Sequence, residues 1–201
     1  MSRGDIIASL IIGEASALLV LFIGRNIALP DKVAGYLYIL PYVFPLLTAA
    51  VMVAGTILAR VLPLFRQITK FSLVGGLNFL IDLSILNLLI AATGIASGFG
   101  ANVFKGVAFI VAVVSSFLWN KFWTFQALSV DNAARQFLRF FTVTSIGFLI
   151  NVGVFALFNN HLGPQAAIDP KTWASVSAAG AAGAGLIWNF LGYKFLVFRK
   201  P

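Results

Sequence analysis

Residues 71–91, FSLVGGLNFLIDLSILNLLIA, form a run of 21 residues with a single charge, Asp82. A helix needs roughly 20 mostly apolar residues to cross the hydrocarbon core of a bilayer. Five further stretches meet this criterion, at about 6–24, 36–59, 103–119, 140–158 and 172–191. Pro, Gly and Asp interrupt the chain between stretches, as turns require. The sequence predicts an all-α integral membrane protein with six transmembrane helices as three hairpins.

The composition supports this prediction. Hydrophobic residues make up 60% of the chain and charged residues 10%, and the mean hydropathy is +0.98. Too few charges are present to coat a soluble globule, and the hydrophobicity excludes disorder. The chain has no cysteine and one histidine, so we expect no disulfide, no metal site and no cofactor.

The basic residues predict the orientation. One set of predicted loops holds ten of them and the opposite set holds four, and the positive-inside rule puts the larger set in the cytoplasm. We therefore expect a multi-pass protein of the cytoplasmic (inner) membrane with both termini cytoplasmic, and no nucleic-acid partner. The larger set is Arg3, Arg60, Arg66, Lys70, Lys121, Arg135, Arg139, Lys194, Arg199 and Lys200; the smaller is Arg25, Lys32, Lys105 and Lys171.

The last two hairpins contain an internal repeat. Residues 70–82 align with 139–151 at an offset of 69, and residues 117–125 align with 190–198 at an offset of 73, with five of those nine positions identical. The four-residue difference falls in an outer loop. Each copy holds two spans, so both copies run in the same direction. We predict a parallel repeat about an axis along the membrane normal.

These residues carry a family resemblance. The basic-Phe-x-x-Val-Gly-Gly-x-Asn-Phe-x-x-Asp pattern from Lys70 and the Phe-x-x-Asn-Lys-Phe-Trp-Thr-Phe pattern ending at Phe125 resemble the GtrA-like membrane proteins. The resemblance covers residues 67–201, with repeat halves at about 67–130 and 135–201, and leaves 1–66 as an extra N-terminal hairpin. It implies translocation of a polyprenyl-phosphate-linked sugar for cell-surface polysaccharide synthesis, or assistance to the glycosyltransferases that make such lipids.

Four basic residues recur symmetrically at the predicted cytoplasmic ends. Lys70 and Arg139 open spans, and Lys121 and Lys194 close them. Gly75-Gly76 leaves backbone accessible behind Lys70, near a helix start that favours anions. We expect these residues to bind a lipid phosphate; the alternative is general attraction to anionic membrane lipids. Candidates for hydrogen bonds to sugar or phosphate, or between helices, are Asn120 and Asn189.

Several polar residues fall inside the predicted spans. Asp82 lies twelve residues beyond Lys70, roughly 18 Å into the membrane, where ionisable groups are costly. Lys105 is its expected partner, because copy two has Asn151 in place of Asp82 and no lysine near the Lys105 position. The pair either fixes the hairpin or serves ligand transit. Asn78 lies one turn before Asp82 on the same helix face.

The sequence contains no P-loop, dinucleotide motif or loop carboxylate pair, so we expect a carrier or accessory protein without catalytic residues. The leading hypothesis is a flippase for a polyprenyl-phosphate sugar. The first alternative is a non-transporting subunit that anchors or assists a glycosyltransferase. A third is a small multidrug-type exporter that uses Glu14, a mid-span acid. A unit this small can also form homo-oligomers.

Overall fold

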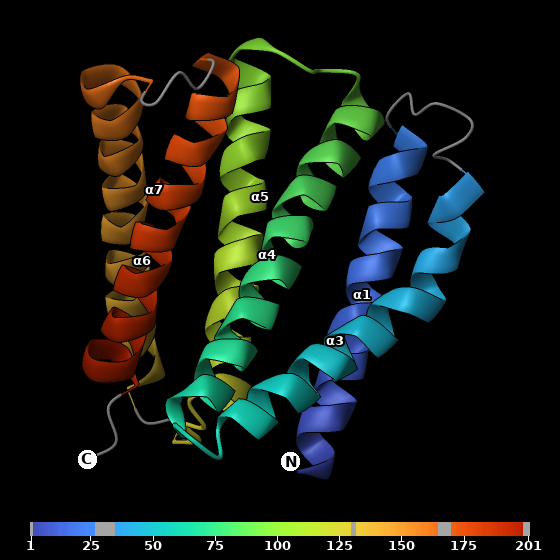
Figure 1. The fold of residues 1–201 in the computed structure, drawn as a ribbon. Helices are drawn as coiled ribbons and strands as arrows, with labels where there is room; N and C mark the ends of the chain where they lie inside the picture. The colour runs from blue at the N-terminus through green and yellow to red at the C-terminus, as the bar shows by residue number, and fades with distance from the viewer. Residues whose placement is uncertain (1, 27–34, 130–131, 165–169, 199–201) are drawn as a thin grey trace. The chain divides into compact units, whose positions relative to one another are not determined.

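The computed structural model describes residues 2–26, 35–129, 132–164 and 170–198, with the side chains of residues 170–172, 174 and 175 left aside. All regular secondary structure in these ranges is helical (Figure 1). The long helices are α1 (Arg3–Asn26), α3 (Leu40–Leu58), α4 (Leu64–Thr93), α5 (Gly98–Trp119), α6 (Ala133–Ala156) and α7 (Pro170–Gly192). The short helices are η1 (Gly35–Ile39), η2 (Asn120–Thr124), η3 (Leu157–Leu162) and η4 (Tyr193–Val197).

The predicted all-α membrane architecture is confirmed. Within the described ranges five helical segments are long and apolar enough to cross a bilayer, and they involve α1, α3, α4, α5 and α6. The sixth helix, α7, has 23 residues, which at 1.5 Å each extend about 34 Å. Helix α4 begins at Leu64, before the apolar run that starts at Phe71. Hydrogen bonding continues beyond the hydrophobic stretch, so Arg66 and Lys70 lie within the helix.

The chain forms two compact units, residues 1–126 and 127–201. The first contains α1, α3, α4 and α5, and the second contains α6 and α7. The boundary at residue 66, where the family resemblance begins, is therefore not a boundary of packing. The N-terminal hairpin packs with the first repeat copy, since α4 contacts both α1 and α3.

The N-terminal hairpin is held by a close helix crossing, and Figure 1 shows α3 passing obliquely across α1. A Cβ atom at Gly13 would collide with the backbone of Phe44 and Pro45, so glycine permits the contact. The Thr48 hydroxyl donates to the Ser9 carbonyl at 2.7 Å across the crossing. Pro45 lies inside α3, whereas Pro41 lies in the first turn of the helix.

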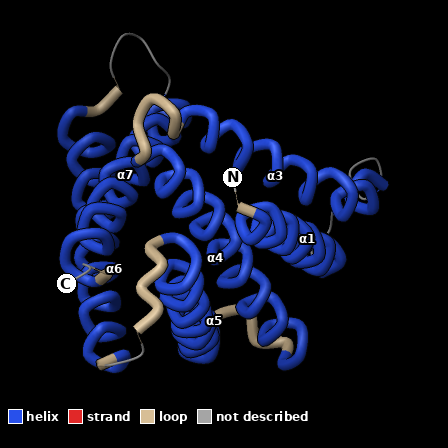
Figure 2. Tube along the Cα trace, turned by 90° about the horizontal axis from the view of Figure 1, so that it is seen from below, coloured by secondary structure: helices blue, strands red, loops and turns tan. Residues whose placement is uncertain are grey.

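A single apolar cluster joins the N-terminal hairpin to the first repeat copy. Ile12 of α1, Met52 of α3, Val74 and Leu77 of α4, and Trp123 of η2 pack together. A second close approach brings Gly55 of α3 against Thr69 of α4. Figure 2 shows α1 and α3 beside α4 in the view along the helices. These contacts fix the start of α4 against α1.

Each repeat copy is an antiparallel helical hairpin. In the first, Gly94 (φ 73°) caps the C-terminal end of α4 and Gly98 (φ 71°) begins α5. These left-handed conformations suit glycine. In the second, a Cβ at Gly147 or Gly192 of α6 and α7 would collide with the facing helix. The Trp188 indole donates to the Val143 carbonyl at 3.0 Å.

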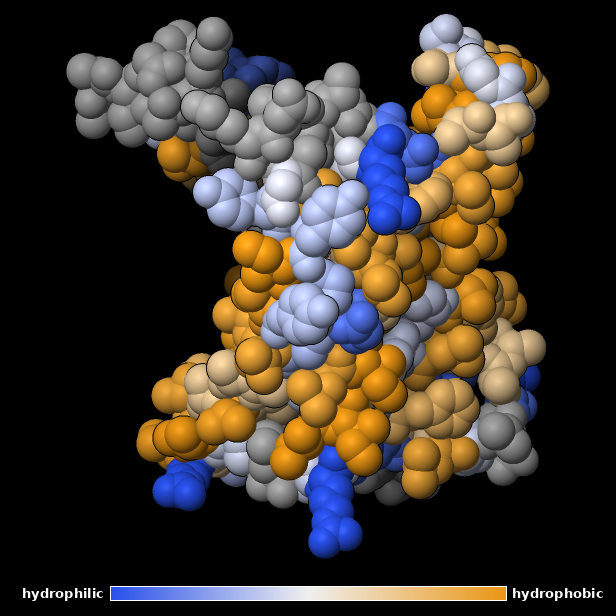
Figure 3. Space-filling model, turned by 90° about the vertical axis from the view of Figure 1, so that its right-hand side faces the viewer, coloured by the Kyte–Doolittle hydropathy of each residue, from blue (hydrophilic) through white to orange (hydrophobic). Residues whose placement is uncertain are grey.

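Much of the helix surface is apolar and exposed. Helix α3 and η1 leave Tyr36, Tyr38, Tyr42 and Leu46 more than 60% exposed. Figure 3 shows a largely apolar face, with hydrophilic residues toward its ends and a further group near its middle. A largely apolar surface is expected of helices that contact lipid, with tyrosine toward the membrane edge.

Candidate functional site

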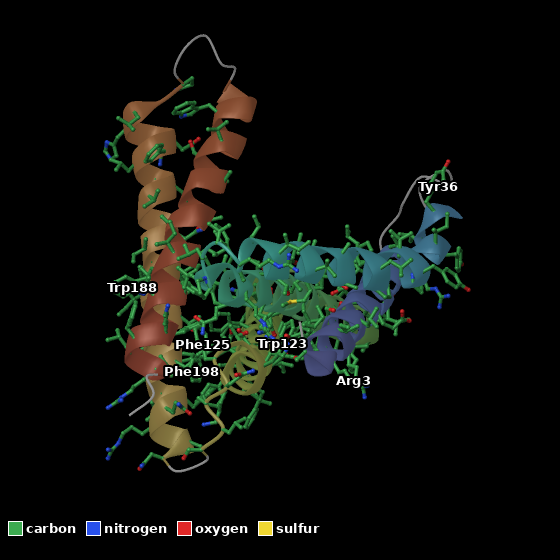
Figure 4. The ribbon with its side chains drawn as sticks, turned by 60° about the horizontal axis from the view of Figure 1, so that its bottom comes forward. Arg3, Tyr36, Trp123, Phe125, Trp188 and Phe198 are labelled. Atoms are coloured by element: carbon green, nitrogen blue, oxygen red, sulfur yellow. The ribbon has the colours of Figure 1, made fainter. Side chains whose placement is uncertain are left out.

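The fold brings Lys70 and Lys121 to the same end of the first repeat copy. Because α4 and α5 are antiparallel, η2 returns to contact α4 near its beginning. Figure 4 labels Trp123 in this region, which lies between the ends of α1, α4 and α5. The two basic residues predicted to bind phosphate in this copy are therefore at one end of one hairpin.

Lys70 is fully engaged by protein groups. Its side chain is 3% exposed, and its Nζ lies 2.5 Å from Oδ1 of Asp5. The same Nζ donates to the Trp123 carbonyl at 3.3 Å and lies 5.2 Å from the centre of the Trp123 ring. A phosphate that binds Lys70 would therefore compete with the carboxylate of Asp5.

Asp5 also binds Arg66, one helical turn before Lys70. The Arg66 guanidinium donates to Oδ2 of Asp5, which also accepts the Ser2 backbone N–H at 3.3 Å. The sequence reasoning missed this cluster of Asp5, Arg66 and Lys70. The sequence offered one indication of the cluster. Asp5 is an acid at the basic-rich end of the first span, and Arg66 and Lys70, four positions apart, lie on one helix face where they could share it.

Lys121 lies in a turn lined with aromatic rings. Helix α5 ends in a π-turn, in which the Phe125 N–H bonds to the Asn120 carbonyl at 2.9 Å. The Lys121 side chain is buried, and its Nζ lies 5.8 Å from the ring centre of Phe117 and 5.9 Å from that of Phe122. These are cation–π distances.

Asn120 is buried beside Lys121. Its amide donates to the Ser116 carbonyl at 2.9 Å and to the Ser116 hydroxyl at 3.3 Å. The Oδ1 atom is buried and accepts no hydrogen bond from any described group. In this geometry Asn120 bonds within its own helix end.

The second unit repeats the same turn. Helix α7 ends in a π-turn closed by a 2.8 Å bond from the Phe198 N–H to the Tyr193 carbonyl. The Nζ of Lys194 lies 6.0 Å from the Phe190 ring centre and 5.4 Å from that of Phe195. These rings are the repeat mates of Phe117 and Phe122. Figure 4 marks Phe198 at this end of the unit.

The turn of the second unit is fastened to α6. The rings of Phe140 and Tyr193 stack with centres 4.2 Å apart, and the Tyr193 and Thr144 hydroxyls are 2.7 Å apart. Arg139, adjacent to Phe140, is exposed, and Lys194 is half-buried. The basic residues are thus buried in the first copy and accessible in the second.

The expected ion pair between Asp82 and Lys105 is present. It joins α4 to α5, with Asp82 15% exposed and Lys105 54% exposed. Asp82 Oδ1 and Asn78 Oδ1 are buried, and neither has a hydrogen-bond partner in the described part of the chain. The Asn78 amide donates back to the Val74 carbonyl at 2.7 Å. Two buried oxygen atoms on this face of α4 therefore accept no hydrogen bond from the described residues.

The remaining polar candidates are separate from this pair. Asn151 of α6 lies close to Gly185 of α7, and the Asn189 amide fills the notch at Gly147. This contact favours a helix-packing role for Asn189. Glu14 is half-buried on α1, next to Gly13. Within the described ranges no group of three His, Cys, Asp or Glu residues could hold a metal ion.

The fold and these turns define a multi-pass α-helical membrane protein with two hairpins that end in the same basic and aromatic turn. Residues 70–198 match the family described as GtrA/DPMS, transmembrane domain, and the chain belongs to this family. The match begins at Lys70, so Asp5 and Arg66 lie outside it. No solved structure matches the chain.

Proposed function

We propose that this protein moves a polyprenyl-phosphate-linked sugar across the cytoplasmic membrane for cell-surface glycan synthesis. It acts as a carrier and not as an enzyme, with both termini in the cytoplasm. Membership of the GtrA/DPMS family supports this proposal. The observation that carries it is the repeated π-turn, which holds Lys121 and Lys194 among phenylalanine rings at the end of each hairpin.

The turn combines the two properties that a lipid phosphate requires. Lysine and arginine form charge-assisted hydrogen bonds with phosphate, while the aromatic rings suit the boundary between headgroups and acyl chains. Arg139 and Lys194 are the accessible cations and would receive the headgroup first. Asn78, Asp82 and Asn151 would offer polar contacts to the sugar during transit, while the prenyl chain stays in lipid.

Flipping of a fluorescent polyprenyl-phosphate sugar in vesicles that contain the pure protein tests this proposal. Lys194→Ala should slow flipping and weaken binding of a polyprenyl phosphate at least tenfold more than binding of phosphatidylglycerol, an order of magnitude expected for one lost charged hydrogen bond. Arg135→Ala is the matched control, because Arg135 is an exposed cation on the same helix as Arg139.

Two results would overturn the proposal. If Lys194→Ala weakens binding of both lipids equally, Lys194 is only a general membrane anchor. Absence of flipping by the pure protein, together with stimulation of a membrane glycosyltransferase, would favour the alternative of a non-transporting subunit.

A further inference from the structure

The cluster of Asp5, Arg66 and Lys70 has unbalanced charge. Two cations meet one carboxylate, and Lys70 and Asp5 are both nearly fully buried. Buried charges are costly unless they are paired and hydrogen-bonded. A second negative charge at this place would complete the balance, and a phosphate monoester carries close to two at neutral pH.

Buried hydrogen-bond donors without a described partner occur in this cluster and in the turn that contacts Lys70. Arg66 Nε, Trp123 Nε1 and the Thr124 hydroxyl are buried, and none has a hydrogen-bond partner among the residues described. Trp123 lies beneath Lys70 Nζ, and Thr124 follows it in the same turn. Buried donors are usually satisfied. Both carboxylate oxygens of Asp5 are already occupied, whereas a phosphate monoester brings three acceptor oxygens.

The position in the fold favours an anion as well. Arg66 lies in the first turn of α4, whose N-cap residue, Pro63, gives no side-chain capping bond. The dipole at a helix start favours negative charge, although the Phe65 N–H of this first turn already donates to the Leu62 carbonyl at 3.0 Å. Arg66 is 38% exposed, so an anion can reach the guanidinium while Asp5 still holds Lys70.

We propose that Arg66 and Lys70 form an exchangeable site for a phosphate monoester, and that Asp5 of the N-terminal hairpin fills this site when the ligand is absent. The ligand chemistry is that of an unglycosylated polyprenyl phosphate or of free phosphate. The inference rests on the proposed function, since it identifies a species that the carrier would bind. Arrival of the dianion on Arg66 displaces Asp5, and Lys70 then turns from the carboxylate to the phosphate.

Binding of radiolabelled polyprenyl monophosphate to the full-length protein in phosphatidylcholine nanodiscs tests the exchange. Arg66→Gln should raise the Kd about tenfold, and Asp5→Asn should lower it by about the same factor, as expected for one charged hydrogen bond. Arg60→Gln is the matched control, because Arg60 is an exposed arginine just before α4, and its Kd should change less than twofold. Unlabelled polyprenyl monophosphate, polyprenol, phosphatidylglycerol and inorganic phosphate serve as competitors. Competition by inorganic phosphate alone would make phosphate the ligand; competition only by the lipid monophosphate would make it the lipid.

The outcomes separate this inference from the proposed function. One outcome would refute the exchange and leave the proposed function standing. In it, the protein binds the lipid and Lys194→Ala weakens binding, but Arg66→Gln has the same Kd as Arg60→Gln. If Asp5→Asn weakens binding, the carboxylate positions the cations and does not compete with phosphate. Should Asp5→Asn fail to fold, Arg66→Gln alone decides, because it leaves the Asp5–Lys70 pair in place. Absence of binding by every form, the unaltered protein included, would refute both.

Discussion

Removal of Lys105 should harm the protein more than removal of its partner Asp82. Lys105→Met would leave a carboxylate that is 15% exposed and has one oxygen already unpaired. Breaking a buried pair from one side costs about 3 kcal/mol or more. Asp82→Asn would leave a lysine that is 54% exposed and can extend toward the membrane surface, so we expect a loss of about 1 kcal/mol, as for an exposed pair.

The measurement is the free energy of unfolding in mixed micelles under increasing SDS for the two single variants and for the double variant Asp82→Asn/Lys105→Met. The double variant removes both charges and resembles copy two, which has Asn151 in place of Asp82. It should be more stable than Lys105→Met by about 2 kcal/mol, because no buried charge is stranded.

Two results would refute this reasoning. One is an equal or larger loss for Asp82→Asn than for Lys105→Met, which would mean that exposure does not decide the cost. The other is strict additivity in the double variant, which would mean that the two charges do not interact. If the double variant regains stability and flipping together, the pair is structural; if it regains stability alone, one of its members contacts the substrate.

Three further predictions concern packing and topology. Gly147→Ala should destabilise the protein by about 1–3 kcal/mol, because the new methyl group meets the Asn189 amide; Gly153→Ala, where the space is open, should be neutral, and thermal unfolding compares the two. Tyr193→Phe should cost about 1 kcal/mol in the same assay through loss of the hydroxyl contact with Thr144; an unchanged midpoint would contradict that contact. Reporter fusions at both chain ends should report a cytoplasmic location, and a periplasmic signal from either end would refute the three-hairpin topology.

The helices and the Asp82–Lys105 pair could be predicted from the sequence because each leaves a regular pattern. Hydrophobic runs of sufficient length specify spanning helices. The ion pair was visible because the second copy lacks both charges. The repeat also indicated that Lys121 and Lys194 occupy matching positions at the ends of their hairpins, and the π-turns place each lysine near two phenylalanine rings.

The burial of Lys70 could not be predicted from the pattern. Asp5 lies 65 positions before it in the chain, and the predicted cytoplasmic end holds several other basic residues that could have paired with Asp5. Which basic residue pairs with Asp5 depends on the helix crossing at Gly13 and on the close approach at Gly55, which bring α1 and α3 against α4. The sequence pattern likewise gives no sign of a π-turn. Such a turn differs from an α-helical turn by one additional residue, which changes only the register of the backbone hydrogen bonds.

The π-turns at Asn120–Thr124 and Tyr193–Val197 make the spacing of each hairpin end sensitive to single residues. A turn of this kind holds one residue more than an α-helical turn. Deletion of one residue within it would restore α-helical register and rotate everything beyond by about 100°. Phe125 and Phe198, now buried, would leave their places in the interior. Conservative substitutions inside the turn should therefore be tolerated far better than any change in its length.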